Sequence, residues 1–308
     1  MRMQEFDPPG KLDCSYGTDG TSTRRSAMLL PLADCARTRL AAISLILSDM
    51  DGTWLGADHH STPGGLAAIQ EAEAAGYLFA FATGRCPASA QGASGLDISK
   101  RPGIYSNGAV VRGKDGADLY TLDLGDDVLA PLKELVASPD AGVTMLLNDR
   151  DHFYVADVGL PMALHLHNEY GDPAPIEGTP ERCQLAHLVG EPDAVDRLEP
   201  RVQAAVGGLA AVARNLPTDL VVSCADANKG VAAAKLAEHL GLEIGRVLAI
   251  GDSGNDAPML RAAALGVVMA NGRPAARDAA EFVTRGSNVD ADEVGVLEAV
   301  RALVAAKG

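Results

Sequence analysis

The stretch Leu45–Trp54 most constrains how this chain can fold. Its first three residues form a short apolar run without alternation, which indicates a strand buried on both faces of a sheet. Asp49 and Asp51 follow the run, and Gly52 permits a sharp turn. Ligands of open α/β sheets bind at the carboxyl ends of strands, and two close carboxylates disfavour joint ionisation. The stretch therefore predicts a divalent metal site or a carboxylate acid–base pair.

Strand, loop and helix patterns alternate along much of the chain. Apolar runs at residues 77–82, 103–105, 247–250 and 266–269 indicate further buried strands, and helical patterns cover 63–75 and 229–240. This order predicts an α/β fold with a doubly wound parallel sheet. Polar side chains follow the strands at Thr83-Gly84-Arg85, Ser106-Asn107-Gly108 and Gly251-Asp252-Ser253-Gly254-Asn255-Asp256.

The pattern changes between residues 125 and 215, where alternating segments are interleaved with amphipathic helices. We expect an α+β module there, inserted between the two halves of the core at residues 43–124 and 216–308. The first residues of the chain are rich in Gly, Ser, Thr, Asp and Pro and show no periodicity. We therefore expect residues 1–42 to form a disordered extension.

Composition narrows the possible partners and the compartment. The 308 residues carry a net charge of −15, which makes a nucleic-acid backbone an unfavourable partner, so an anionic substrate needs a local cluster of positive charge. No apolar run approaches the length of a membrane span. The five scattered cysteines lack a C-x-x-C pair, which is typical of a reducing compartment and predicts a cytoplasmic protein. We expect either a monomer or a homodimer.

The polar groups after the strands suit a phosphoryl group, whose oxygens require a metal, hydroxyl and amide donors, and a cation. Lys229 begins a predicted helix, where the helix dipole disfavours a cation, so it requires an anionic partner. The candidate groups are the carboxylates of Asp49, Asp51, Asp252 and Asp256, the Thr83 hydroxyl, the Gly84 amide, the Lys229 amine, and the Asn107 and Asn255 amides.

These residues fall into four motifs that together resemble those of the haloacid dehalogenase superfamily. The motifs are Asp49-Met-Asp51-Gly-Thr, Thr83-Gly-Arg, Asn228-Lys229-Gly and Gly251-Asp-Ser-Gly-Asn-Asp256. More narrowly the chain is similar to the Cof-type sugar phosphatases, and the resemblance covers about Leu45 to Glu298. It implies a Rossmann-like catalytic core and identifies the inserted segment with a substrate-specificity cap.

The resemblance also implies a mechanism. Asp49 is expected to attack phosphorus and form an aspartyl-phosphate, which divides one difficult step into two. Asp51 is expected to protonate the leaving oxygen and then to activate water, which requires a raised pKa in the first step. A second Asp two residues after the nucleophile is typical of the phosphatases and mutases of this superfamily and disfavours dehalogenase chemistry.

The remaining expected roles concern ligands. Magnesium is expected to bind the carboxylates of Asp49 and Asp252 and the backbone carbonyl of Asp51. Asp256 is expected to orient Lys229 or metal-bound water. The phosphoryl oxygens are expected to bind Thr83, the Gly84 amide, Lys229 and Asn255, and the leaving group to contact Arg85 and Asn107.

The expected activity is therefore a Mg²⁺-dependent phosphatase of small phosphorylated metabolites, with sugar phosphates as the implied class. A phosphomutase that uses the same aspartyl-phosphate is the closest alternative. A receiver-type phospho-acceptor is disfavoured by the inserted module, and a nucleotide-binding dehydrogenase by the lack of a glycine-rich fingerprint. His59-His60 and His165-x-His167 lack a third ligand, so a transition-metal site there is disfavoured.

Overall fold

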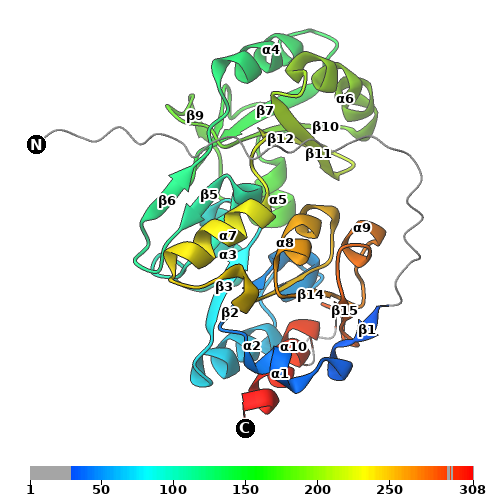
Figure 1. Cartoon of the computed structure of the whole chain (residues 1–308). Helices are drawn as coiled ribbons and strands as arrows, with labels where there is room; N and C mark the ends of the chain where they lie inside the picture. Colours follow the sequence, from blue (N-terminus) through cyan, green and yellow to red (C-terminus); the bar gives the residue numbers. More distant parts are fainter. Residues whose placement is uncertain (1–28, 290–291, 293, 308) are drawn as a thin grey trace, which may run out of the picture.

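The computed structural model describes residues 29–289, 292 and 294–307, and these form two β-sheets with their helices (Figure 1). The larger sheet is parallel from β1 to β4 and continues through an antiparallel hairpin. Its strands, in spatial order, are β1 (Leu30–Pro31), β15 (Phe282–Val283), β14 (Leu265–Val268), β13 (Val247–Gly251), β2 (Leu45–Ser48), β3 (Leu78–Ala82), β4 (Gly103–Tyr105), β5 (Val110–Arg112) and β6 (Asp118–Thr121).

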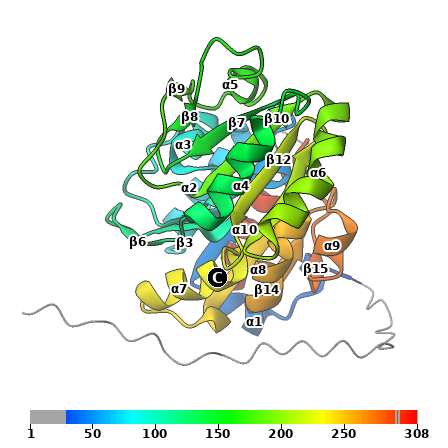
Figure 2. The ribbon, with the colours of Figure 1, turned by 90° about the horizontal axis from the view of Figure 1, so that it is seen from above.

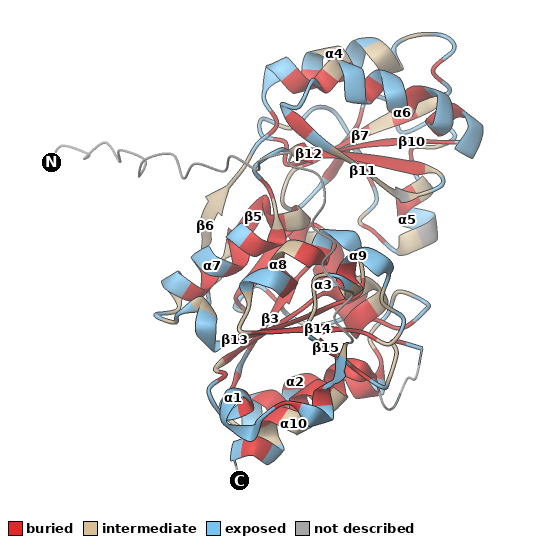
Figure 3. Ribbon diagram, turned by 45° about the vertical axis from the view of Figure 1, so that its right-hand side comes forward, coloured by how far each residue is buried: buried red, intermediate tan, exposed pale blue. Residues whose placement is uncertain are grey.

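Helices cover both faces of this sheet because its central strands are apolar on both sides. Ile46 of β2 packs with one helical layer, whereas Leu45 and Leu47 pack with the other. Figure 3 shows the helices buried on the side that faces the sheet and exposed on the outer side. The first layer contains α1 (Arg37–Ala41), α2 (Pro63–Ala74), α3 (Pro87–Ser94) and α10 (Gly295–Lys307), and the second contains α7 (Lys229–His239), α8 (Ala257–Ala262) and α9 (Pro274–Arg277). The predicted doubly wound α/β core is confirmed.

The start of the described chain is part of this core. β1 pairs in parallel with β15, and Leu32 and Leu40 are buried in the same apolar cluster as α2 and α10. The expectation of a disordered segment through residue 42 is therefore wrong for residues 29–42, because their leucines add apolar surface to the sheet edge and the helical layer. Residues 1–28 lie outside the described part of the chain.

The second sheet carries two helices on one face and turns its other face toward the core (Figures 1 and 2). Helices α4 (Asp126–Val136) and α6 (Pro192–Val206) bury their apolar sides against it, and α5 (His165–Tyr170) lies at its edge nearer the core. The strands, in spatial order, are β11 (Ala210–Leu216), β12 (Asp219–Cys224), β10 (Leu185–Gly190), β7 (Val143–Asn148), β8 (Phe153–Val155) and β9 (Ile176–Glu177). We call this module the cap.

The expected cap boundary at residue 215 is wrong, because the second sheet continues to Cys224. β12 pairs antiparallel with both β11 and β10 and is central in the cap. Its first five residues are buried, and Leu220, Val221 and Val222 form a short apolar run like those of the core strands. Hydrophobicity alone therefore did not assign β12 to the correct sheet.

Among the described residues, no helix combines the length and the apolar character needed to cross a bilayer.

The N-terminal packing gives a first testable prediction. Leu32→Ala should lower the free energy of unfolding by about 2–5 kcal/mol, because Leu32 is fully buried and truncation leaves a cavity. Leu30→Ala is the matched control, since Leu30 is exposed and its loss should change stability by less than about 0.5 kcal/mol. Urea unfolding of both variants would show equal, small effects if the segment did not belong to the core.

Candidate active site

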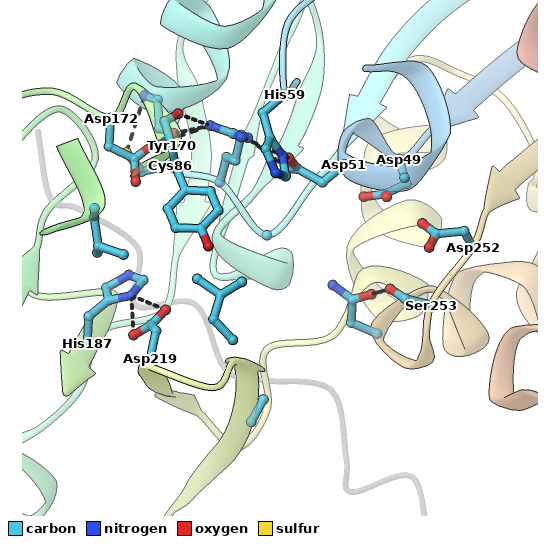
Figure 4. Close-up of a pocket in the computed structure, with 18 of the residues that line it drawn as sticks. Asp49, Asp51, His59, Cys86, Tyr170, Asp172, His187, Asp219, Asp252 and Ser253 are labelled. Carbon is cyan, nitrogen blue, oxygen red and sulfur yellow. Dashed lines mark hydrogen bonds and ion pairs between the residues drawn. The ribbon is translucent and has the colours of Figure 1, made fainter. Parts of the chain in front are cut away.

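Parallel strand pairing brings distant acids together at one edge of the core sheet. Asp49 directly follows β2 and Asp252 directly follows β13, and these two strands are neighbours in register, with Ser48 opposite Ile250. Figure 4 shows the carboxylates of Asp49 and Asp252 facing each other across a short gap. Sequence separation therefore has no bearing on their proximity, which follows from the sheet order.

A buried lysine is held between two carboxylates at this edge. Lys229 Nζ donates to Asp49 Oδ1 at 2.7 Å and to Asp256 Oδ1 at 2.6 Å, and no part of Lys229 is exposed. Burial acts to lower the pKa of Lys229, but the charges of Asp256 and Asp49 outweigh it and raise that pKa, so the amine stays protonated. These two acids are the anionic partners that its position at a helix start requires.

Asp256 holds Lys229 and the loop after β13 together through hydrogen bonds. Its Oδ1 accepts from Lys229, and its Oδ2 accepts from the backbone amides of Asp252 at 3.0 Å and Ser253 at 2.9 Å. Both oxygens are therefore engaged with the protein. Asp256 fixes the lysine and the loop that carries Asp252, which is the geometry of a residue that positions other groups.

The acidic cluster has the donor set of a divalent-cation site. Carboxylate oxygens of Asp49, Asp252 and Asp256 lie within 4.8 Å of one another, and all three residues are buried. Burial, followed by the charge of Asp256, raises the pKa of Asp49 well above its usual range, although Lys229 opposes this shift. The same two causes raise the pKa of Asp252 to about 6. Hard oxygen ligands with excess negative charge fit magnesium, and Asp49 and Asp252 are the ones whose oxygens are less engaged.

Thr53 and Gly52 fix Asp252 from the first motif. Thr53 Oγ1 donates to Asp252 Oδ1 at 3.1 Å. Gly52 has a φ of 80°, and a Cβ at this position would lie 2.6 Å from Asp252 Oδ2. Glycine is therefore required here for both its backbone conformation and its lack of a side chain.

The other predicted groups surround this cluster. Thr83 is fully buried and its Oγ1 accepts from the Arg85 amide at 3.1 Å, while Gly84 lines the adjoining cavity. Asn255 also lines the cavity, and its Nδ2 donates to Asn107 Oδ1 at 2.9 Å. Asn107 itself is not among the lining residues, so the structure gives it a role in supporting Asn255.

A cavity of about 730 Å³ lies between this edge of the core and the inner face of the cap. Its core side includes Asp49, Asp51 and Asp252, and its cap side includes Tyr170, His187 and Asp219, which lie across the cavity in Figure 4. Sequence reasoning identified none of the cap-side residues, because nothing in their local pattern marks them. Only the fold of the inserted segment brings them to the site.

The comparisons with known proteins agree with this geometry. Residues 46–299 match the model of the haloacid dehalogenase-like hydrolases. The chain belongs to this family.

Among curated relatives of this hydrolase, YxeH of Bacillus subtilis, described as a phosphatase, is 30% identical and aligns with 85% of this chain and 99% of its own. HMP-PP phosphatase of Yersinia pestis is 31% identical over 77% of this chain and 85% of its own. A HAD/COF-like hydrolase from Plasmodium vivax has the same fold, with a TM-score of 0.75 at 21% identity, covering 86% of this chain and 98% of that one. This haloacid dehalogenase-like hydrolase is a Cof-type phosphatase, a phosphoric monoester hydrolase.

The structure of this hydrolase departs from expectation at Asp51. Arg85 clamps its carboxylate, with Nε donating to Oδ2 at 2.7 Å and Nη2 to Oδ1 at 2.8 Å, and His59 Nδ1 lies 2.8 Å from Oδ1. Burial alone would raise the pKa of Asp51, but the hydrogen bonds from His59 and Arg85 outweigh it and hold that pKa below its usual value. The raised pKa expected for the acid–base residue is therefore not found in this conformation.

Arg85 and His59 also connect the core to the cap of the hydrolase. Arg85 Nη1 donates to Asp172 Oδ1 at 3.3 Å and to Ser89 Oγ at 3.1 Å, so the same guanidinium contacts one carboxylate from each domain. The ring of His59 packs edge-on against Tyr170 at 5.2 Å. The expectation that Arg85 is available for the substrate is thus modified, since its three nitrogens already have partners.

Strained backbone is confined to this region of the hydrolase. Among the described residues, those other than glycine with positive φ are His59, Ser106 and Asn107, at 61°, 51° and 57°. His59 bonds to Asp51 and Asn107 bonds to Asn255, so two of the three present a side chain to a site residue. Strain of this kind persists where the surrounding structure over-determines it, and it clusters at functional sites. The pair His59-His60, set aside as metal ligands, thus contains a residue of the site.

Lys229→Met provides a test of the buried ion pairs. In EDTA it should lower the free energy of unfolding by about 3–5 kcal/mol, because Asp49 and Asp256 are left buried without their cation. Lys133→Met on the exposed face of α4 is the control and should be nearly neutral. Urea unfolding that gave the same small change for both variants would contradict the ion-pair assignment.

Proposed function

We propose that this phosphatase is Mg²⁺-dependent and hydrolyses phosphate monoesters of small metabolites, with sugar phosphates as the main class, through an aspartyl-phosphate on Asp49. The observation that supports it most is the buried Asp49–Lys229–Asp256 arrangement beside Asp252, which opens into a cavity closed by the cap. A nucleophilic carboxylate, an adjacent cation and a metal-binding acid are the groups that phosphoryl transfer needs.

Asp49 is the nucleophile in this proposal. Lys229 fixes its Oδ1, which leaves the other oxygen to form the bond to phosphorus as the bond to the leaving oxygen breaks. The ammonium of Lys229 then offsets the charge on the phosphoryl oxygens, and the Thr83 hydroxyl, the Gly84 amide and Asn255 supply donors around them. Asp256 holds the lysine in place throughout.

Asp51 serves the leaving group and the water. In its ionised form it can take a proton from the water that attacks the aspartyl-phosphate, which matches the state seen here. Protonation of the leaving oxygen in the first step requires the Arg85 clamp on Asp51 to loosen. Arg85 already has a second carboxylate partner in Asp172, so it can remain charge-paired while it does so.

Magnesium, held by the carboxylates of Asp49 and Asp252 and by the Asp51 carbonyl, would polarise the phosphoryl group and screen the acids from one another. The residues fit such an ion because three buried carboxylates share a single buried lysine.

The cavity volume of about 730 Å³ suits a small phosphorylated metabolite. A relative described as HMP-PP phosphatase supports a phosphorylated substrate here as well. Four cysteines in the described part of the chain are free, and three of them are buried, which fits a reducing compartment and hence the cytoplasm.

Phosphate release from a panel of sugar, nucleotide and cofactor phosphates tests this function. We expect release with Mg²⁺, loss of nearly all activity in Asp49→Asn, and loss in EDTA, because the nucleophile and the metal each serve the whole reaction. Activity that survives both changes contradicts the mechanism. Transfer of phosphate between sugar positions without release to water would identify a mutase instead.

Metal binding can be measured without turnover. MgCl₂ should raise the melting temperature, since ligand at roughly 100 times its Kd stabilises the folded state by about 2.7 kcal/mol. Asp252→Asn should lose this rise, whereas Asp151→Asn, an exposed acid of the cap, should keep it. An unchanged Mg²⁺-dependent rise in Asp252→Asn would place the ion elsewhere.

A further inference from the structure

The cap side of the cavity combines apolar residues with the buried pair of His187 and Asp219 and with two further charged residues, Asp172 and Arg214. Phe153, Leu166, Leu185 and Leu216 supply the apolar part of the lining. Leu185 and His187 are two residues apart on β10, so both point from the same face of the cap sheet. The apolar residues favour a leaving group that is largely uncharged, and His187 adds a polar position on the same face of the sheet.

That polar position is the pair of His187 and Asp219 from the adjacent strands β10 and β12. His187 Nδ1 lies 3.2 Å from Asp219 Oδ1 and 3.1 Å from Oδ2, so Nδ1 carries a proton and the carboxylate fixes the ring. The other ring nitrogen, Nε2, is buried and has no hydrogen-bond partner among the described residues. Buried polar atoms are normally paired, so an unpaired one at the wall of a binding cavity points to a partner from the ligand.

Two of the three arginines in the lining, Arg214 and Arg85, already have charged partners. Arg214 Nε donates to Leu216 O at 3.3 Å and Nη2 to Pro217 O at 2.5 Å, and Nη1 is paired with Asp196 and Glu199. Arg85 is divided between Asp51 and Asp172, as described above. The third arginine, Arg273, is exposed and belongs to the core loop after β14, outside the cap wall. No cation of the cap wall is therefore left for an anionic leaving group.

The carboxylates of the cap lining repel an anionic leaving group. Asp172 and Asp219 are both buried on the cap side, where Asp172 is paired with Arg85 and Asp219 with His187, whose charge also acts on Asp172. Burial lowers the pKa of His187, but the charge of Asp219 outweighs it and the pKa is raised. Even with His187 protonated, its charge is matched by Asp219, so a second anion would enter a wall with no surplus positive charge.

We propose that the His187–Asp219 pair is a leaving-group subsite that takes an uncharged hydrogen-bonding group such as a hydroxyl, and that the cap wall selects monophosphates of neutral alcohols over esters bearing a second anionic group. This inference rests on the proposed function, because it names the substrate class of the same site.

A matched pair of substrates tests the selectivity. Sorbitol 6-phosphate and 6-phosphogluconate share a six-carbon chain and a phosphate ester, and differ in one carboxylate. We expect kcat/KM for sorbitol 6-phosphate to be at least about tenfold higher, because like charges juxtaposed at a binding surface are strongly disfavoured. Glucose 6-phosphate and glucose 1,6-bisphosphate form a second pair with the same expectation. Equal or faster hydrolysis of the doubly anionic esters would overturn the proposal.

Two variants test the subsite itself. His187→Gln should raise KM for sorbitol 6-phosphate severalfold more than KM for acetyl phosphate, because the hydroxyl loses its partner whereas the acetyl group is too small to reach the cap wall. Asp219→Asn should narrow the preference for sorbitol 6-phosphate over 6-phosphogluconate at least threefold, because it removes one carboxylate from the wall. His152→Gln, an exposed histidine of the cap outside the lining, is the control and should behave as the unmodified enzyme.

The outcomes separate the two levels of inference. If acetyl phosphate and all the esters release no phosphate with Mg²⁺, the proposed function fails and the subsite fails with it. If acetyl phosphate is hydrolysed but both variants treat the paired esters as the unmodified enzyme does, only the subsite is wrong. Should His187→Gln lose its melting transition, the substrate ratio in Asp219→Asn decides alone.

Discussion

One buried ammonium group between two buried carboxylates determines the organisation of the catalytic edge. Lys229 cannot be desolvated without Asp49 and Asp256, and these acids in turn require a cation to remain ionised at this depth. Its bonds draw the start of α7, the end of β2 and the loop after β13 to one point. Asp256 also accepts hydrogen bonds from the backbone amides of Asp252 and Ser253, and these bonds fix the direction of Asp252. The acidic cluster that fits magnesium is a consequence of this arrangement.

The cap completes a site whose chemistry lies entirely in the core. The inner face of the cap sheet supplies the far wall of the cavity, and Arg85 joins the two parts by contacting Asp51 of the core and Asp172 of the cap. Asp51, for which we propose a role at the leaving oxygen, is thereby connected to the position of the cap. Opening the cap would remove Asp172 from Arg85, so the charge environment of Asp51 depends on whether the site is closed.

Much of the core could be predicted because parallel sheets impose a simple rule. Polar residues that follow buried strands meet at one edge, which is why the sequence alone indicates that Asp49, Thr83 and Asp252 lie there. The same reasoning failed where a local pattern has two structural outcomes. β12 is as apolar as a core strand but belongs to the cap, and the leucines at 32 and 40 are buried although composition indicated disorder. The first motif places Asp51 just after β2, but the direction of its carboxylate depends on contacts with Arg85 and His59.

The sequence alone determined the α/β class, the family and the set of groups at the strand ends, because strand burial and motif spacing are written locally along the chain. Tertiary structure alone decided which atoms of those groups are free and which are engaged. In the folded chain, Lys229 bonds to Asp256 as well as to Asp49, and the carboxylate of Asp51 points toward Arg85. His187 lies on the cavity wall opposite Asp49. Side-chain direction and pairing depend on contacts between segments far apart in the chain, and such contacts have no local signature.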